Sequence, residues 1–310
     1  MQKSAKAFLA TLKKDGVFYT SEKLALYLKS LIDDAGVSYS EVYDPTCGAG
    51  ALLKVFPDDI KKYGQDIDGA EVEKAERSIK NFVGVAGNTL EQPAFQDKKF
   101  FAISFNAPFS VAWNADALKD DARFAHLPAM PPKSKADYAF LAHIMHCLED
   151  GGVAAGLCFP GILYRKNAEG KIRRYFVEHN YIEKIIAIPP KQFDDTAICT
   201  VALVLRKGRK ENTVTFVNEQ GTERTVDFSE IKENDFNLSV NLYIQEEDEK
   251  EPIDINAINA ELYELFFTRF EKDLALFAFE KDELGIARNF RDIRQRIEKI
   301  LDDFEQRKLF

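Results

Sequence analysis

Residues 106–109, with the sequence NAPF, place an amide side chain, a backbone kink and an aromatic ring directly after an apolar run. That run is too short for a helix and is typical of a buried strand, which Pro108 must end because it has no N–H for the ladder. The Asn106 side-chain oxygen and a backbone carbonyl can accept the two N–H bonds of an exocyclic amine, and Phe109 can stack on its ring. These residues predict a site for a flat, amine-bearing base, with an ordinary turn after a strand as the alternative.

A glycine loop at residues 44–50, with the sequence DPTCGAG, is the second stretch whose residue types suit a ligand. Glycines at 48 and 50 let the backbone approach a bound molecule closely. The loop is not the fingerprint of dinucleotide dehydrogenases, because the third glycine is absent and Asp44 precedes the loop. A carboxylate at this point disfavours a pyrophosphate and favours a cationic group, such as the amino end of S-adenosylmethionine.

Two further segments carry side chains that suit a nucleoside. Asp66 follows the glycine loop by about twenty residues, and an acid at this spacing accepts hydrogen bonds from ribose hydroxyls in nucleoside-binding folds. Asp68 is expected to cap a helix over residues 69–82, and a third strand is expected over residues 83–90. Asn88 in that third segment can bind an adenine edge through its amide.

The histidines and cysteines give little support to a metal site. His143 and His146 lie three residues apart in an expected helix over residues 137–148, so they could share one metal ion. No third ligand with a suitable spacing follows, so packing or solvent-facing roles are favoured and we expect no metal. The four cysteines have no CxxC pairing and are expected to be reduced core residues.

The elements that position these residues alternate between strands and helices as far as residue 245. Such alternation predicts an α/β protein with a doubly wound, parallel, Rossmann-like sheet, whose ligand crevice lies at the carboxyl ends of the strands. An acidic linker and a helical pattern follow, with apolar stripes at 262–270 and 293–304 that indicate packing onto the body or a partner helix. The expected organisation is an N-terminal helical segment with a cofactor-contacting turn at 1–36, a catalytic domain at 37–245 and a C-terminal helical extension at 246–310.

Composition and charge restrict the partners. The chain has 310 residues, 45% of them hydrophobic, and a formal net charge of −9. An acidic chain gains little non-specific attraction to nucleic acid, so binding to DNA needs a local basic patch or a basic partner. Basic clusters lie at 164–174 and 206–210, although such runs are usually solvated surface. No stretch is apolar enough for a membrane span or a signal peptide, and we expect a cytoplasmic protein.

Taken together, these motifs resemble the methylation subunit of type I restriction-modification systems, a family that methylates adenine N6 in DNA with S-adenosylmethionine. The resemblance runs from about residue 16 to residue 244 and rests on the segments at 16–20, 44–50, 64–66, 87–90, 106–110, 170–174 and 188–193. Asn88 replaces the more usual acid of the adenine segment, and Ala107 stands where the family has proline.

The resemblance implies a site-specific adenine-N6 DNA methyltransferase that uses S-adenosylmethionine and acts on a base flipped out of the duplex. The net charge predicts weak DNA binding by this chain alone, and the lack of a long apolar stretch predicts no membrane partner. The resemblance implies a specificity subunit and a restriction subunit as partners. The residues implied to be catalytic are Asn106, Ala107, Pro108 and Phe109. The residues implied to bind the cofactor are Tyr19, Thr20, Asp44, Thr46, Cys47, Gly48, Gly50, Asp66, Ile67, Asn88, Thr89, Leu90 and Asn106.

Two other functions stay open on the sequence alone. The chain could methylate a different amine-bearing substrate, such as an RNA base or a protein glutamine. Alternatively, Ala107 could mark a catalytically weakened or silent module that binds the cofactor within an assembly.

Overall fold

The computed structural model describes residues 20–189, 199–244, 255–285 and 290–306. The chain forms two compact units, Met1–Glu246 and Glu247–Phe310. Residues 1–19 of the expected N-terminal segment lie outside the described residues, and Tyr19 is among them.

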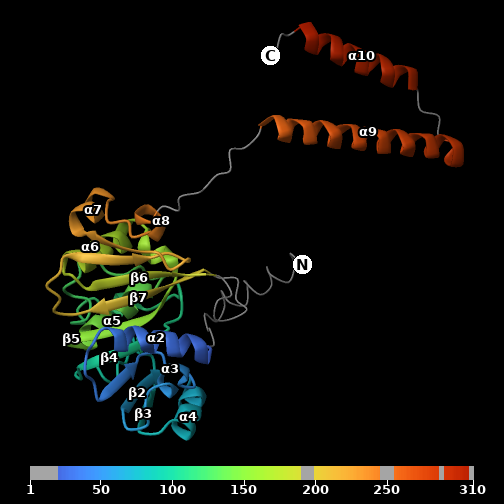
Figure 1. Cartoon of the computed structure of the whole chain (residues 1–310). Helices are drawn as coiled ribbons and strands as arrows, with labels where there is room; N and C mark the ends of the chain where they lie inside the picture. The colour runs from blue at the N-terminus through green and yellow to red at the C-terminus, as the bar shows by residue number, and fades with distance from the viewer. Residues whose placement is uncertain (1–19, 190–198, 245–254, 286–289, 307–310) are drawn as a thin grey trace. The chain divides into compact units, whose positions relative to one another are not determined.

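A nine-stranded sheet forms the centre of the first unit, with the strand order β3-β2-β1-β4-β5-β7-β6-β8-β9 (Figure 1). Its strands are β1 (Glu41–Asp44), β2 (Lys61–Asp66), β3 (Phe82–Ala86), β4 (Phe100–Phe105), β5 (Leu148–Cys158), β6 (Ile182–Ile188), β7 (Thr200–Arg206), β8 (Thr213–Val217) and β9 (Glu223–Asp227). Neighbouring strands from β3 to β5 are parallel, as are β6 and β8. However, β7 is antiparallel to both β5 and β6, and β9 is antiparallel to β8. The predicted α/β class is confirmed, and the sheet is mixed rather than wholly parallel.

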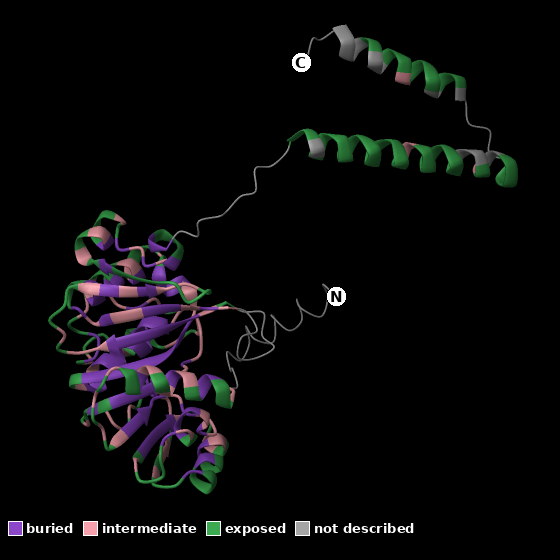
Figure 2. Ribbon diagram, viewed as in Figure 1, coloured by how far each residue is buried: buried purple, intermediate pink, exposed green. Residues whose placement is uncertain are grey.

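Helices cover both faces of this sheet. They are α2 (Glu22–Asp34), α3 (Ala51–Lys54), α4 (Gly69–Ser78), α5 (Asp137–Cys147), α6 (Asn167–Glu178), α7 (Phe228–Glu233) and α8 (Val240–Tyr243), with short 3₁₀ helices η1 (Ala115–Leu118) and η2 (Pro160–Leu163). Successive side chains on a strand point to opposite faces. Accordingly, Tyr43 of β1 packs in a cluster with Leu141 of α5 and Phe176 of α6. Its neighbour Val42 packs in another cluster with Leu53 of α3, so the strands are buried on both sides (Figure 2).

Local signals set most helix boundaries. Ser21 caps α2, because its hydroxyl accepts the Leu24 N–H at 3.4 Å. Asp68 caps α4 as predicted, through a 2.9 Å hydrogen bond from the Ala70 N–H. The predicted end of α4 at residue 82 was wrong, because the helix stops at Ser78 and residues 82–86 form β3. Asn81 lies between them with a left-handed φ of 53°, which turns the chain into the strand.

The second unit contains α9 (Ile255–Leu284) and α10 (Phe290–Gln306), so the predicted helical pattern of the tail is confirmed. Leu262, Leu265 and Phe266 of α9 are exposed in this unit. Ile297, which is half-buried, is the apolar residue of the predicted stripe at 293–304 whose side chain falls among the described ones. None of the described helices is both long enough and apolar enough to cross a membrane.

Candidate functional site

The strand order brings the predicted site residues to one edge of the sheet. Asp44 ends β1, Asp66 ends β2, and Asn106 comes directly after β4. These three strands are parallel neighbours in the order β2-β1-β4, so their carboxyl ends share an edge. Asn88 follows β3, which lies beside β2 at the same edge. Segments separated by more than sixty residues in the sequence therefore form one site region.

The glycine loop is held by Asp66. One Asp66 oxygen accepts the Gly48 N–H at 2.7 Å, and the other accepts the Asp68 N–H at 3.0 Å. Gly50 has a φ of 79° at the N-cap of α3, and a Cβ added there would lie 2.1 Å from Ile79 Cδ1. A side chain at position 50 is therefore excluded both by the backbone and by space. A carboxylate has about four acceptor positions, so Asp66 keeps capacity for ligand hydroxyls while it fixes the loop.

Asp44 is a buried carboxylate with an unusual environment. Its side chain is 1% exposed, and its one described hydrogen bond comes from the Thr46 N–H at 3.0 Å. No lysine or arginine of the described residues forms an ion pair with it. Burial raises the pKa of Asp44 to about 8, and the nearby charge of Asp66 adds to this shift. A carboxylate that is costly to ionise without a partner is suited to a cationic ligand group, which would restore its charge.

The predicted adenine segment turns back on the glycine loop. The Asn88 side-chain oxygen accepts the Leu90 N–H at 3.0 Å, which leaves the amide NH₂ as the group of Asn88 that can donate to a ligand. The Thr89 hydroxyl donates to the Pro45 carbonyl at 2.5 Å. Thr89 and Leu90 are both buried, so their side chains shape the loop from inside.

The adenine segment is also held by Arg123, a buried arginine that the sequence did not predict as part of the site. Arg123 is 0% exposed and donates to the backbone carbonyls of Thr89 at 2.9 Å and of Leu90 at 2.5 Å. It also binds both oxygens of Asp121, at 2.9 and 2.7 Å. The segment around it has no periodic pattern, and an Asp-x-Arg spacing is too common to mark a site.

His143 belongs to the same buried network. Arg123 Nη1 lies 3.2 Å from His143 Nδ1, so this ring nitrogen must be the acceptor. His143 Nε2 then carries the proton and lies 3.0 Å from the hydroxyl of Tyr43, the residue that precedes Asp44 in β1. Burial, followed by the charge of Arg123, lowers the pKa of His143 to about 3, so the ring is neutral. Among the described residues, no group of three or more His, Cys, Asp or Glu side chains could hold a metal ion.

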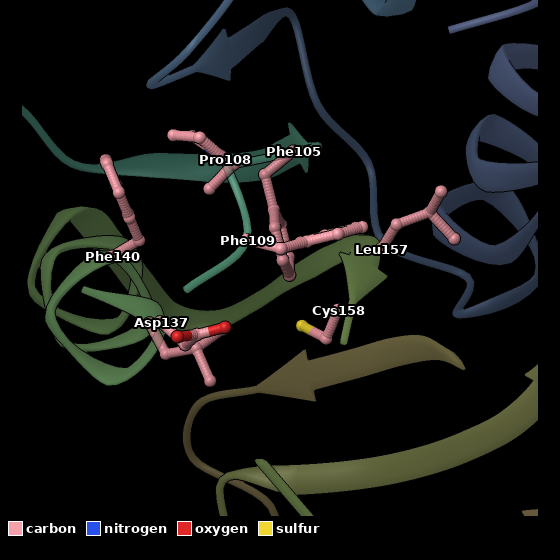
Figure 3. A pocket seen from close by; sticks show the side chains of 9 residues that line it. Phe105, Pro108, Phe109, Asp137, Phe140, Leu157 and Cys158 are labelled. Carbon is pink, nitrogen blue, oxygen red and sulfur yellow. The ribbon is translucent and has the colours of Figure 1, made fainter. Parts of the chain in front are cut away.

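The NAPF loop, defined as residues 106–109, has a fixed beginning. Asn106 Nδ2 donates to the Thr20 hydroxyl at 3.0 Å, so Thr20 orients the side-chain amide of Asn106. The amide oxygen of Asn106 is left to accept a ligand N–H. Ala107, Pro108 and Phe109 line a small pocket (Figure 3). The other residues that line it are Phe105, Asp137, Phe140, Leu141, Leu157 and Cys158.

Two other predicted cofactor residues, Cys47 and Ile67, differ in their exposure to solvent. Cys47 is buried and its N–H donates to the Gln65 carbonyl at 2.9 Å. Burial raises the pKa of its thiol, so Cys47 is a packing residue and not a nucleophile. Ile67 is 73% exposed beside Asp66, so its side chain offers an apolar surface on which a flat ring could lie.

Comparison with known proteins identifies relatives over most of the chain. The model of the N-6 DNA Methylase family matches residues 5–224. The type I restriction enzyme MpnII methylase subunit of Mycoplasma pneumoniae is 28% identical over 311 residues, which cover 82% of this chain and 57% of that protein. The MjaVII methylase subunit of Methanocaldococcus jannaschii is 25% identical over 309 residues, covering 78% of this chain and 52% of that protein. The chain thus spans about half the length of these curated relatives.

Solved structures show the same fold. The methyltransferase subunit of a type I restriction-modification system from Streptococcus thermophilus aligns with a TM-score of 0.67 and 28% identity, covering 73% of this chain and 59% of that one. The EcoKI M protein aligns with a TM-score of 0.52 and 19% identity, covering 66% and 48% of the two chains.

Proposed function

Because this chain belongs to the N-6 DNA methylase family, we propose that it transfers a methyl group from S-adenosylmethionine to the N6 atom of adenine in DNA. The proposal extends to its role as the modification subunit of a type I restriction-modification system, in line with the names of its curated relatives.

The observation that carries this proposal is the buried carboxylate of Asp44. Its burial, its raised pKa and the absence of a described cationic partner fit a ligand whose amino group is positive. Asp66 and Asn88 are spaced along the same edge for a ribose and a base. S-adenosylmethionine has all three groups, and it supplies the methyl on a sulfonium.

The NAPF loop provides the acceptors for the reacting amine. The amine of adenine is a poor nucleophile, because its lone pair is delocalised into the ring. Acceptance of its two hydrogens by the Asn106 oxygen and the carbonyl of Ala107 favours a pyramidal nitrogen and stabilises the positive charge that grows on it. Phe109 stacks on the extruded base, and no strong base is required until the methyl has moved.

DNA binding and specificity are proposed to come from partner subunits. A net charge of −9 gives this chain little attraction for phosphates, so a specificity subunit must supply most of the affinity. The exposed apolar residues of α9 are proposed as its docking surface, and a restriction subunit is proposed as a further partner.

The test is methyl transfer by the complex purified from its host. The complex would be incubated with DNA and S-adenosylmethionine labelled in its methyl group, and the modified base would be identified after digestion. We expect labelled N6-methyladenine from the wild-type complex and none from Asn106→Ala, since no backbone group replaces the amide oxygen.

Ala107 supports a second candidate, a silent module that binds the cofactor within an assembly. A wild-type complex that binds S-adenosylmethionine by calorimetry and labels no DNA would select this second function.

A further inference from the structure

Ser110, the residue that follows the NAPF loop, is bound by Arg165 from a different part of the chain. Arg165 lies between η2 and α6, and its Nη2 donates to the Ser110 hydroxyl at 3.1 Å. The Ser110 N–H donates to Asp137 Oδ1, at the start of α5, at 3.3 Å. Arg165 Nη1 in turn lies 3.2 Å from Glu169 and 3.8 Å from Asp137 Oδ2. Ser110, Asp137, Arg165 and Glu169 together form what we name the Arg165 latch.

Ser110 has a backbone conformation that needs such support. Its φ is 52°, in the left-handed region that side chains other than glycine seldom adopt. Strained residues of this kind persist where the surroundings hold them, and they concentrate at functional sites. Here both the N–H and the hydroxyl of Ser110 are held by the latch.

The fold makes specific room for Arg165. Its guanidinium lies 5.2 Å from the centre of the Phe159 ring. A Cβ added at Gly161 would lie 2.5 Å from Arg165 Nε, so the absent side chain is what admits the guanidinium. Glu169 and Asp137 are both buried, and Asp137 Oδ2 accepts no hydrogen bond from any described residue. Burying two carboxylates around one arginine is costly, and the arrangement fixes the direction of the guanidinium more than it stabilises the fold.

The latch and the site meet in one small pocket. Asp137 lines this pocket together with Ala107, Pro108 and Phe109, and Figure 3 shows its carboxylate beside the loop. The loop is thus fixed at both ends, by Thr20 on Asn106 and by the latch on Ser110.

We propose that Arg165 is a positioning residue for the NAPF loop, acting through Ser110 to hold the Ala107 carbonyl and the Phe109 ring in the geometry that receives the target amine. This role rests on the proposed methyl transfer. It predicts an effect on the transfer step and not on cofactor affinity, because the cofactor residues Asp44 and Asp66 lie on other strands.

The variant is Arg165→Lys, which keeps the charge but cannot reach Ser110 and both carboxylates together. The matched control is Arg209→Lys, because Arg209 is partly buried and binds the carbonyls of Ile182 at 2.7 Å and of Thr213 at 3.0 Å, away from the loop. Ser110→Ala removes only the hydroxyl, and the double variant with Arg165→Lys completes a cycle.

Two measurements on the full chain with its partner subunit decide the role. In single-turnover reactions, Arg165→Lys should lower the methyl-transfer rate at least about tenfold and leave the dissociation constant for S-adenosylmethionine within about twofold. In hydrogen exchange, the peptide covering residues 106–112 should exchange faster in Arg165→Lys than in wild type or Arg209→Lys. Ser110→Ala should add little to either effect in the double variant.

The outcomes separate the two proposals. The positioning role is overturned if Arg165→Lys changes the exchange and the transfer rate no more than Arg209→Lys does. It is also overturned if the effects of Arg165→Lys and Ser110→Ala on these quantities add fully in the double variant. If the wild-type complex methylates no DNA, the proposed function fails, and the exchange measurements and their cycle still decide whether Arg165 holds the loop.

Discussion

Replacing Asp44 by asparagine should change stability and cofactor binding in opposite directions. The folded pKa of Asp44 is raised to about 8 by burial, whereas an aspartate in an unfolded chain has a pKa of about 3.9. Between these values the folded protein binds more protons than the unfolded chain, so this carboxyl group's contribution to stability is present at low pH and is lost as the pH rises to 8. Asparagine removes that loss, and its oxygen can still accept the Thr46 N–H.

The size of the effect follows from the shift. About four pKa units set an upper limit of about 5 kcal/mol, and water entering the loop reduces it, so we expect a gain of about 1–3 kcal/mol in the cofactor-free protein at about pH 8. Little gain is expected at about pH 4, where the group is protonated in the folded protein and about half protonated in the unfolded chain. The same change removes a charge-assisted bond to the amino end of S-adenosylmethionine, worth about 1.5–3 kcal/mol, or roughly a tenfold to hundredfold loss of affinity.

The assay combines urea unfolding at low and high pH without cofactor with calorimetry of S-adenosylmethionine binding. The control is Asp68→Asn, because Asp68 is an exposed carboxylate near the same edge and asparagine caps a helix as well as aspartate. It should change neither quantity. If Asp44→Asn binds S-adenosylmethionine as tightly as wild type, Asp44 is not the partner of a cationic ligand group and the main support for the proposed cofactor is lost.

Other variants test other parts of the site. Asp66→Asn should weaken S-adenosylmethionine binding at least about tenfold by calorimetry, because an amide oxygen cannot hold both the loop N–H groups and a ribose hydroxyl. Deleting residues 247–310 should leave that affinity unchanged and abolish association with the specificity subunit in gel filtration; an intact complex would refute the docking role. Ala107→Pro should raise the methyl-transfer rate and stabilise the chain by about 0.4–1 kcal/mol, because the Ala107 N–H donates no hydrogen bond to a described residue and proline gives up none there. An Ala107→Pro complex that binds cofactor and shows no transfer would favour the silent module.

The fold class, and the gathering of the candidate site residues at one edge of the sheet, could be predicted from sequence because the signals are local. The apolar run before Asn106 indicates a strand, as do the short segments that end at Asp44 and Asp66, and parallel strands bring their carboxyl ends to one edge. The pairing of strands depends on residues far apart in the sequence, so it is not predicted by local signals. Nothing within the residues of β7 indicates that it lies antiparallel between β5 and β6, and the short β9 shows too few apolar residues to be recognised.

Residues that hold the site were missed for the same reason. Arg123 supports the adenine segment through the carbonyls of Thr89 and Leu90, more than thirty residues away in sequence. Arg165 contacts Ser110 across fifty-five residues. Arg123 binds backbone carbonyls, which every residue has, so no pattern of residue types indicates that contact. Arg165 binds the Ser110 side chain, and nothing local to either residue indicates that they meet.

The two arginines suggest how the site divides its tasks. Arg123 is coupled to the proposed cofactor site, because it binds backbone carbonyls of Thr89 and Leu90, and Thr89 donates to Pro45 beside Asp44. Arg165 is coupled instead to the proposed target-base loop through Ser110. Cofactor affinity and methyl transfer should therefore respond to different variants, and a screen restricted to the motif residues would not separate them. Loss of Arg123 should weaken cofactor binding in protein that still folds, whereas loss of Arg165 should slow transfer with the cofactor bound.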